Sequence, residues 1–165
     1  MAFTHLLVPT DFSEPASQAL RYAIEEATLH HAKGTLLHVL PPHTDTNVYY
    51  VTGMPVPSFD LEGTGVAAPS PSPPTVVRRD HGEEALARLH DLIPEAFRGI
   101  WEAEVAAGQP AETIVRVARE RNADLVVMGT HGRTGLQHVL LGSVAEKVVR
   151  LAPCPVLTVR YTGRG

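Results

Sequence analysis

The residues best suited to chemistry in this chain are glycines near its C-terminal end. Gly129 and Gly132 follow the apolar run 125–128, and the pair Gly142-Ser143 precedes a helical pattern. Glycines let backbone N–H groups approach an anion closely, and the N-terminus of a helix adds unpaired donors and a partial positive charge. The segment therefore predicts a phosphate site and, with it, a nucleotide-binding function.

Two better-known phosphate loops are absent from the sequence. A Walker loop requires a lysine before its Ser or Thr, and no lysine precedes Ser143. The first expected strand-to-helix turn, residues 9–13, contains no glycine, which argues against a dinucleotide-type Rossmann site. The glycines lie after the fourth expected strand instead.

Strand-like apolar runs alternate with longer helical patterns along the chain. Short, continuously apolar runs are typical of strands that are covered on both faces. We expect strands over residues 3–9, 35–40, 101–107, 124–128 and 155–160, and helices over residues 13–32, 80–97, from 110 onward and 143–151. This alternation predicts an α/β fold, a single domain built on a five-stranded parallel, doubly wound (Rossmann-like) sheet of order 3-2-1-4-5.

Several boundaries of these elements follow from local residue types. Ser13 is expected to cap the first helix, and Gly34 is expected to end it. Capping-box patterns at residues 80–83 and 143–146 predict where two later helices begin.

The segment of residues 41–77 differs in composition from the rest of the chain. It holds eight of the fourteen prolines, with Gly, Ser and Thr between them. Because proline fixes φ and removes a backbone donor, we expect a long loop or insert rather than a packed element. Two interpretations stay open at this point: a tolerated surface insertion, or a flap over a ligand at the end of the second strand.

Composition and charge restrict the class of protein. The chain has 165 residues, 44% of them hydrophobic and 19% charged, as in soluble globular domains. Its net charge of −4 argues against a nucleic-acid partner, and no apolar run approaches the roughly 20 residues that span a bilayer. The N-terminus lacks the features of a signal peptide, and the single Cys154 cannot form an internal disulfide. We therefore expect a cytoplasmic protein without a membrane partner.

The expected sheet order places Asp11 at a candidate binding crevice. Strands one and four are neighbours in that order, and a crevice opens at their carboxyl ends. Asp11 follows strand one and Gly129 follows strand four, so both should face this crevice. A carboxylate accepts hydrogen bonds from vicinal hydroxyls, which makes Asp11 a candidate ribose contact. The alternative is that Asp11 is only a turn or cap residue.

Nine histidines raise the question of a metal site, but their spacing matches no structural zinc pattern, and we expect no metal ligands among them. His5 and His38 are expected on strands. His131 lies inside the expected phosphate loop, where it either contacts a phosphate oxygen or is simply exposed at a turn. Arg133 is the stronger candidate, because a permanent cation suits phosphate.

The glycine spacing and its flanking residues resemble the universal stress protein family. The similarity extends over nearly the whole chain, from residues 6–13 to residues 153–159. The pattern over residues 129–143 is similar to that of the subgroup that binds ATP. The resemblance implies a Rossmann-like domain that forms a homodimer, often by pairing of the last strands, which here contain Val156, Leu157, Thr158 and Val159.

The resemblance also implies roles for single residues. Asp11 would contact the ribose, and Val39 would contact the adenine through its backbone. The residues implied to bind the nucleotide are Pro9, Thr10, Asp11, Val39, Met128, Gly129, His131, Gly132, Arg133, Gly142, Ser143 and Val144.

These observations favour an ATP-binding regulatory protein of the stress response. ATP, with Mg²⁺, would occupy the crevice and act as a conformational or partner switch. One alternative is a slow ATPase or phosphotransferase, although the expected loop offers no further carboxylate to orient water. Another is a dimeric scaffold that binds AMP or no nucleotide.

Overall fold

The computed structural model describes residues 2–42, 49–51, 75–77, 81–131 and 141–160. Its elements follow one another as β1 (His5–Pro9), α1 (Glu14–His30), β2 (Lys33–Leu40), β3 (Tyr49–Val51), β4 (Thr75–Val77), α2 (His81–Leu92), the 3-10 helix η1 (Glu95–Phe97), β5 (Trp101–Ala107), α3 (Pro110–Glu120), β6 (Leu125–Gly129), α4 (Ser143–Leu151) and β7 (Val156–Val159).

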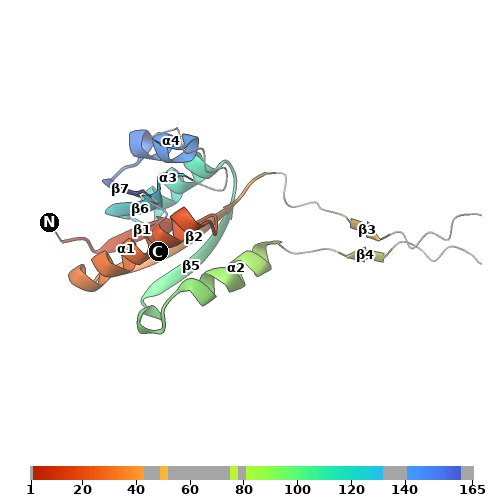
Figure 1. Cartoon of the computed structure of the whole chain (residues 1–165), viewed down its shortest axis with the longest axis horizontal. Helices are drawn as coiled ribbons and strands as arrows, with labels where there is room; N and C mark the ends of the chain where they lie inside the picture. The colour runs from red at the N-terminus through yellow and green to blue at the C-terminus, as the bar shows by residue number, and fades with distance from the viewer. Residues whose placement is uncertain (1, 43–48, 52–74, 78–80, 132–140, 161–165) are drawn as a thin grey trace, which may run out of the picture.

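The main sheet has five strands in the order β5-β2-β1-β6-β7 (Figure 1). Each neighbouring pair is parallel, with Leu6 of β1 opposite both Gly34 of β2 and Leu125 of β6. Numbered along the chain, the strands of this sheet stand in the order 3-2-1-4-5. The predicted fold class is therefore confirmed.

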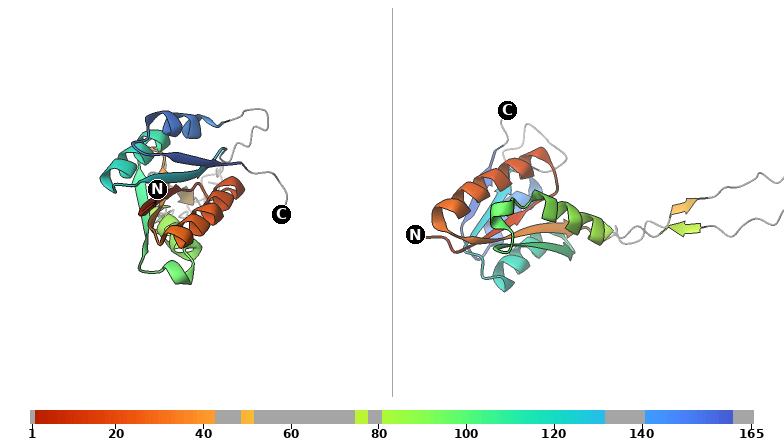
Figure 2. Two further views of the ribbon diagram at one scale, coloured as in Figure 1. Left: turned by 90° about the vertical axis from the view of Figure 1, so that its left-hand side faces the viewer. Right: turned by 90° about the horizontal axis from the view of Figure 1, so that it is seen from below.

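Helices cover both faces of this sheet, as Figure 2 shows. On one face, α1 and α2 pack against a core that includes Leu6, Leu36 and Leu89. On the other face, α3 and α4 pack against a core that includes Leu7 and Leu37. Neighbouring residues of β1 thus enter opposite cores, which explains why its sequence is continuously apolar. Within the described ranges, none of the helices has the length and apolarity that a membrane span requires.

The start of α1 agrees with the sequence, but its end does not. Ser13 is the N-cap, and its side chain accepts a hydrogen bond from the N–H of Ala16. The helix ends at His30 and is capped by His31, whose φ of 53° is left-handed. The prediction that Gly34 ends this helix was wrong, because Gly34 lies inside β2. A Cβ there would lie 2.5 Å from the Trp101 ring, so close packing requires the glycine.

Two other boundaries also differ from the prediction. The helix expected to continue to Phe97 ends at Leu92, because Pro94 disfavours helical backbone just before it. The capping box assigned to Ser143 is not formed: Gly142 is the N-cap of α4, and no side chain caps this helix end. Helix α4 therefore begins with backbone donors that no side chain of the described residues satisfies.

The proline-rich segment 41–77 lies mostly outside the described residues. Within it the structure describes β3 and β4, which pair antiparallel with Tyr49 opposite Val77. No packed element was expected here. The extent of the insert and its role as a flap stay predictions.

Candidate functional site

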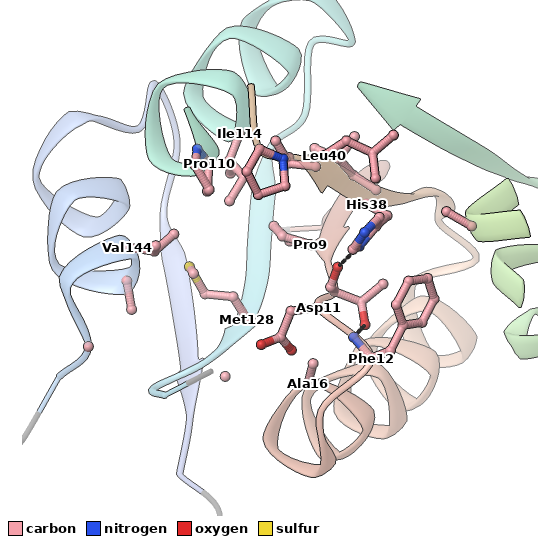
Figure 3. A pocket seen from close by; sticks show the side chains of 18 of the residues that line it. Pro9, Asp11, Phe12, Ala16, His38, Leu40, Pro110, Ile114, Met128 and Val144 are labelled. Carbon is pink, nitrogen blue, oxygen red and sulfur yellow. Dashed lines mark hydrogen bonds between the residues drawn. The ribbon is translucent and has the colours of Figure 1, made fainter. Parts of the chain in front are cut away.

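A pocket of about 620 Å³ opens at the carboxyl ends of β1, β2 and β6 (Figure 3). Its volume falls within the range of small-molecule sites. It contains every predicted site residue that the structure describes, namely Pro9, Thr10, Asp11, Val39, Met128, Gly129, His131, Gly142, Ser143 and Val144. The two other predicted residues, Gly132 and Arg133, lie outside the described part of the chain.

The turn between β1 and α1 holds Asp11 at the middle of this pocket. The N–H of Thr10 donates to the carbonyl of Leu37 at 2.8 Å, which ties the turn to β2. Both the N–H and the hydroxyl of Ser13 donate to Oδ1 of Asp11. Asp11 is half-buried, and its carboxylate lies between Met128 and Ala16 in Figure 3. The turn role and the pocket role of Asp11 are therefore compatible.

Helix α4 presents its N-terminus to the same pocket. The N–H of Gly142 donates to the carbonyl of Thr130 at 2.7 Å, and the Gly142 carbonyl accepts from Glu146 as the first helical bond. The N–H groups of Ser143, Val144 and Ala145 precede any intrahelical acceptor. All three residues line the pocket. The site thus offers main-chain donors and the positive end of a helix dipole, both of which favour anions.

Two predicted glycines have packing roles that the sequence did not reveal. A Cβ on Gly129 would lie 3.1 Å from the backbone of Pro15, where β6 meets the first turn of α1. A Cβ on Gly142 would lie 3.1 Å from the carbonyl oxygen of Thr130. Both contacts are tight and involve backbone, so a larger residue would shift the chain at the rim of the pocket. Packing within the protein therefore favours glycine at both positions, independently of any ligand.

An apolar wall faces the pocket from the α3 side of the sheet. Leu40 at the end of β2 lies beside Pro110 and Ile114 of α3 (Figure 3). Val39 is half-buried next to Leu40, and Met128 lines the pocket from β6. These side chains offer a surface for a flat, weakly polar group such as a base.

The opposite wall comes from residues that the sequence analysis did not assign to the site. Helix α2 contributes His81, Glu84, Ala85 and Arg88 to the lining, and Phe12 and His38 lie beside them. The Arg88 guanidinium carbon is 3.8 Å from the centre of the Phe12 ring. The Phe12 ring centre is 4.5 Å from that of His38. Only the topology brings α2 to this edge, so no local sequence signal could have identified the wall.

Three of the described histidines that the sequence analysis considered have hydrogen-bond partners. His5 and His38 lie on strands, as expected. Nδ1 of His38 donates to the carbonyl of Thr10 at 2.8 Å, and Nε2 of His5 lies 2.9 Å from the Thr35 hydroxyl. Nδ1 of His131 lies 2.9 Å from the Thr130 hydroxyl at the rim of the pocket. Among the described residues, no group of three or more His, Cys, Asp or Glu side chains could hold a metal ion.

Comparisons with known proteins agree with this fold. The profile of the universal stress protein family matches residues 2–160. The universal stress protein MJ0531 of Methanocaldococcus jannaschii is 34% identical over 159 residues, which cover 96% of this chain and 82% of that protein.

Solved structures are similar over nearly the full length. The structure of MJ0577 from the same organism superimposes with a TM-score of 0.70 at 25% identity, covering 98% of this chain and 99% of that one. A universal stress protein in complex with cAMP superimposes with a TM-score of 0.62 at 22% identity, covering 97% and 98%. The match to the family profile spans the whole sheet and all of its helices, and the chain belongs to the universal stress protein family.

Proposed function

We propose that this protein binds ATP in the pocket at the carboxyl ends of β1, β2 and β6 and that the nucleotide regulates its shape or its partners. One observation carries the proposal: Asp11 and the uncapped N-terminus of α4 line the same cavity. A carboxylate suits ribose hydroxyls, and free main-chain donors suit phosphates. A nucleotide carries ribose hydroxyls and phosphates in one molecule.

The walls of the pocket support one orientation of the nucleotide. The base would lie against Leu40, Pro110 and Ile114, with the backbone of Val39 at its edge. The ribose would contact Asp11, and the phosphates would extend toward the N–H groups of Ser143 and Val144. The structure solved with cAMP supports an adenine nucleotide, because that protein has the same fold.

Magnesium would be bound mainly through the phosphates. Mg²⁺ keeps several waters and commonly uses one or two carboxylates together with phosphate oxygens. Asp11 and Glu84 are the carboxylates among the described lining residues, and they come from different walls. The site therefore fits an ion that arrives with ATP better than one that the protein holds alone.

The two edges of the sheet differ in a way that favours dimers through β7. At the β5 edge, Glu102 and Glu104 form ion pairs of 2.8 and 2.6 Å with Arg121, and such charges discourage pairing with another strand. At the β7 edge, Leu157 is exposed, and so is Val149 on the adjacent α4. A second copy that pairs along β7 would cover both side chains.

Two measurements test this function. Small molecules released from freshly purified, denatured protein are identified by mass spectrometry, and we expect ATP among them. Isothermal titration of nucleotide-free protein with ATP and with AMP then gives the affinities. Tighter binding of ATP is expected, because its additional phosphates reach α4. If neither ATP nor AMP binds, the proposal is refuted.

The regulatory part of the proposal has a test of its own. Saturating ATP is expected to change the rate at which a protease cleaves within residues 41–77. This segment joins β2 to α2, and both elements line the pocket. An unchanged cleavage rate would leave ATP as a ligand but contradict the switch.

A further inference from the structure

The wall of the pocket that α2 forms carries a positive charge. Among its described lining residues, Arg88 is the only lysine or arginine. It comes from α2, whereas the main-chain donors proposed for the 5′-phosphates come from α4. The two anion-attracting features are therefore on different walls of one cavity.

Arg88 is held in place without a carboxylate partner among the described residues. Its guanidinium lies over the Phe12 ring at 3.8 Å, a cation–π contact. None of the ion pairs formed by the described residues includes Arg88, although Glu84 precedes it by one turn on the same helix. A guanidinium stacked on an aromatic ring keeps its N–H donors at its edge, where a ligand can reach them.

The backbone of Phe12 is adapted to this contact. Its φ of 63° lies in the left-handed region, which is unusual for a bulky residue. The N–H of Phe12 donates to the Thr10 hydroxyl at 3.0 Å, which stabilises the turn. The conformation places the ring beside His38 and under Arg88, immediately after Asp11. Unfavourable backbone held at a pocket is often connected with function.

Figure 3 shows how these groups lie relative to one another. Asp11 is between Met128 and Val144 on one side and Phe12 and His38 on the other. If the 5′-phosphates extend toward α4, the 2′ and 3′ oxygens of a ribose at Asp11 face the side of Phe12. A group attached to either oxygen would then extend toward Arg88.

We propose that Arg88 forms a second anion subsite that takes a phosphate on the 2′ or 3′ oxygen of the ribose. This inference rests on the proposed function, since it assumes a nucleotide whose ribose lies at Asp11. The preferred ligand class is then a nucleotide with phosphate at both its 5′ and its 2′ or 3′ positions. In dinucleotide sites, an arginine near the ribose accommodates a 2′-phosphate. Asp11 would then contact the ribose hydroxyl that carries no phosphate. Glu84 opposes further negative charge, so the subsite suits a single phosphate group.

The test compares ligands with equal numbers of phosphates. Isothermal titration is carried out with adenosine 3′,5′-bisphosphate, adenosine 2′,5′-bisphosphate and ADP, whose two phosphates are both on the 5′ side. The measured quantity is the affinity for each bisphosphate divided by the affinity for ADP. It is determined for the wild type, Arg88→Met, which keeps an apolar chain over Phe12, and Arg88→Lys, which keeps the charge. Arg98→Met, at an exposed arginine outside the pocket, is the matched control.

For one of the two bisphosphates, Arg88→Met is expected to lower this ratio by about tenfold or more, which is what one charge-assisted contact is worth. Arg88→Lys should fall between the wild type and Arg88→Met, and Arg98→Met should keep the wild-type ratio. An equal ratio in the wild type and Arg88→Met would overturn the subsite. If the wild type binds ATP and ADP but substitution of Arg88 leaves the bisphosphate-to-ADP affinity ratio unchanged, the inference fails and the proposed function stands. If no nucleotide binds, both fail.

Discussion

Replacement of Asp11 by asparagine bears most directly on the placement of the nucleotide. Oδ1 of Asp11 accepts hydrogen bonds from the N–H and the hydroxyl of Ser13. Asparagine keeps an acceptor oxygen for both bonds, so the turn and the start of α1 should be retained. It removes the negative charge that the ribose hydroxyls would contact. Asp11→Asn therefore separates the binding role of the residue from its role in the turn.

The size of the effect follows from the contact that is lost. A hydrogen bond to a charged group contributes about 1.5–3 kcal/mol, and each 1.4 kcal/mol changes an affinity tenfold. We therefore expect Asp11→Asn to weaken ATP binding by about 10- to 150-fold. The midpoint of urea unfolding should change little, because the bonds to Ser13 are retained.

A double-mutant cycle shows whether the lost contact is to the ribose. ATP and 2′,3′-dideoxy-ATP are titrated into the wild type and Asp11→Asn, with Asp91→Asn, an exposed residue of α2 outside the pocket, as control. Removal of the hydroxyls should weaken binding to the wild type but hardly affect the variant further. If Asp11→Asn weakens dideoxy-ATP as much as ATP, Asp11 does not contact the ribose and the orientation is wrong.

Three other changes test the fold and the assembly. Gly34→Ala should lower the free energy of unfolding in urea by about 1–3 kcal/mol, because its Cβ would lie 2.5 Å from the Trp101 ring, and unchanged stability would contradict this packing. Burial holds the pKa of His5 below its ordinary value. The free energy of unfolding should therefore fall as the pH drops below about 6.5, where the unfolded chain takes up a proton that the folded chain resists, and an equally steep fall in His5→Gln would refute this assignment. Leu157→Arg at the β7 edge should produce monomers in analytical ultracentrifugation, whereas an intact dimer would exclude that edge as the interface.

The strands of the main sheet could be predicted because their signals are local, and their order then followed from the doubly wound fold. Leu6, Leu7 and Val8 form a continuous apolar run, and the structure shows why: alternate residues enter two cores, one on each face. Once strands one and four are neighbours, Asp11 and Gly129 must approach the same crevice. That part of the pocket therefore followed from topology.

The errors at Gly34 and Ser143 both came from local sequence rules that contacts elsewhere in the chain override. Glycine after a helical pattern usually marks a C-cap, and Ser before Glu at this spacing usually marks a capping box. Gly34 instead accommodates the Trp101 ring, which is distant in sequence, and Gly142 takes the capping position one residue earlier than expected. Packing against the Trp101 ring decided the first case, and the hydrogen bond from the Gly142 N–H to the Thr130 carbonyl accompanies the second.

The α2 wall could not be predicted for a different reason. In the sequence, Glu84 and Arg88 are typical of the solvent-facing side of an amphipathic helix. The buried residues of α2 are Ala85 and Leu89, which an apolar pattern can indicate. The proline-rich segment also separates α2 from β2 in the sequence. Only the folded chain shows that Arg88 lies over Phe12 at the pocket.

A crystal structure of the protein with ATP and Mg²⁺ tests the central claim most directly. We predict that the phosphate oxygens accept hydrogen bonds from the main-chain N–H groups of Ser143 and Val144 while the ribose hydroxyls contact Asp11. A structure in which ATP lies outside this pocket, or in which its phosphates extend away from the N-terminus of α4, would contradict the proposed site.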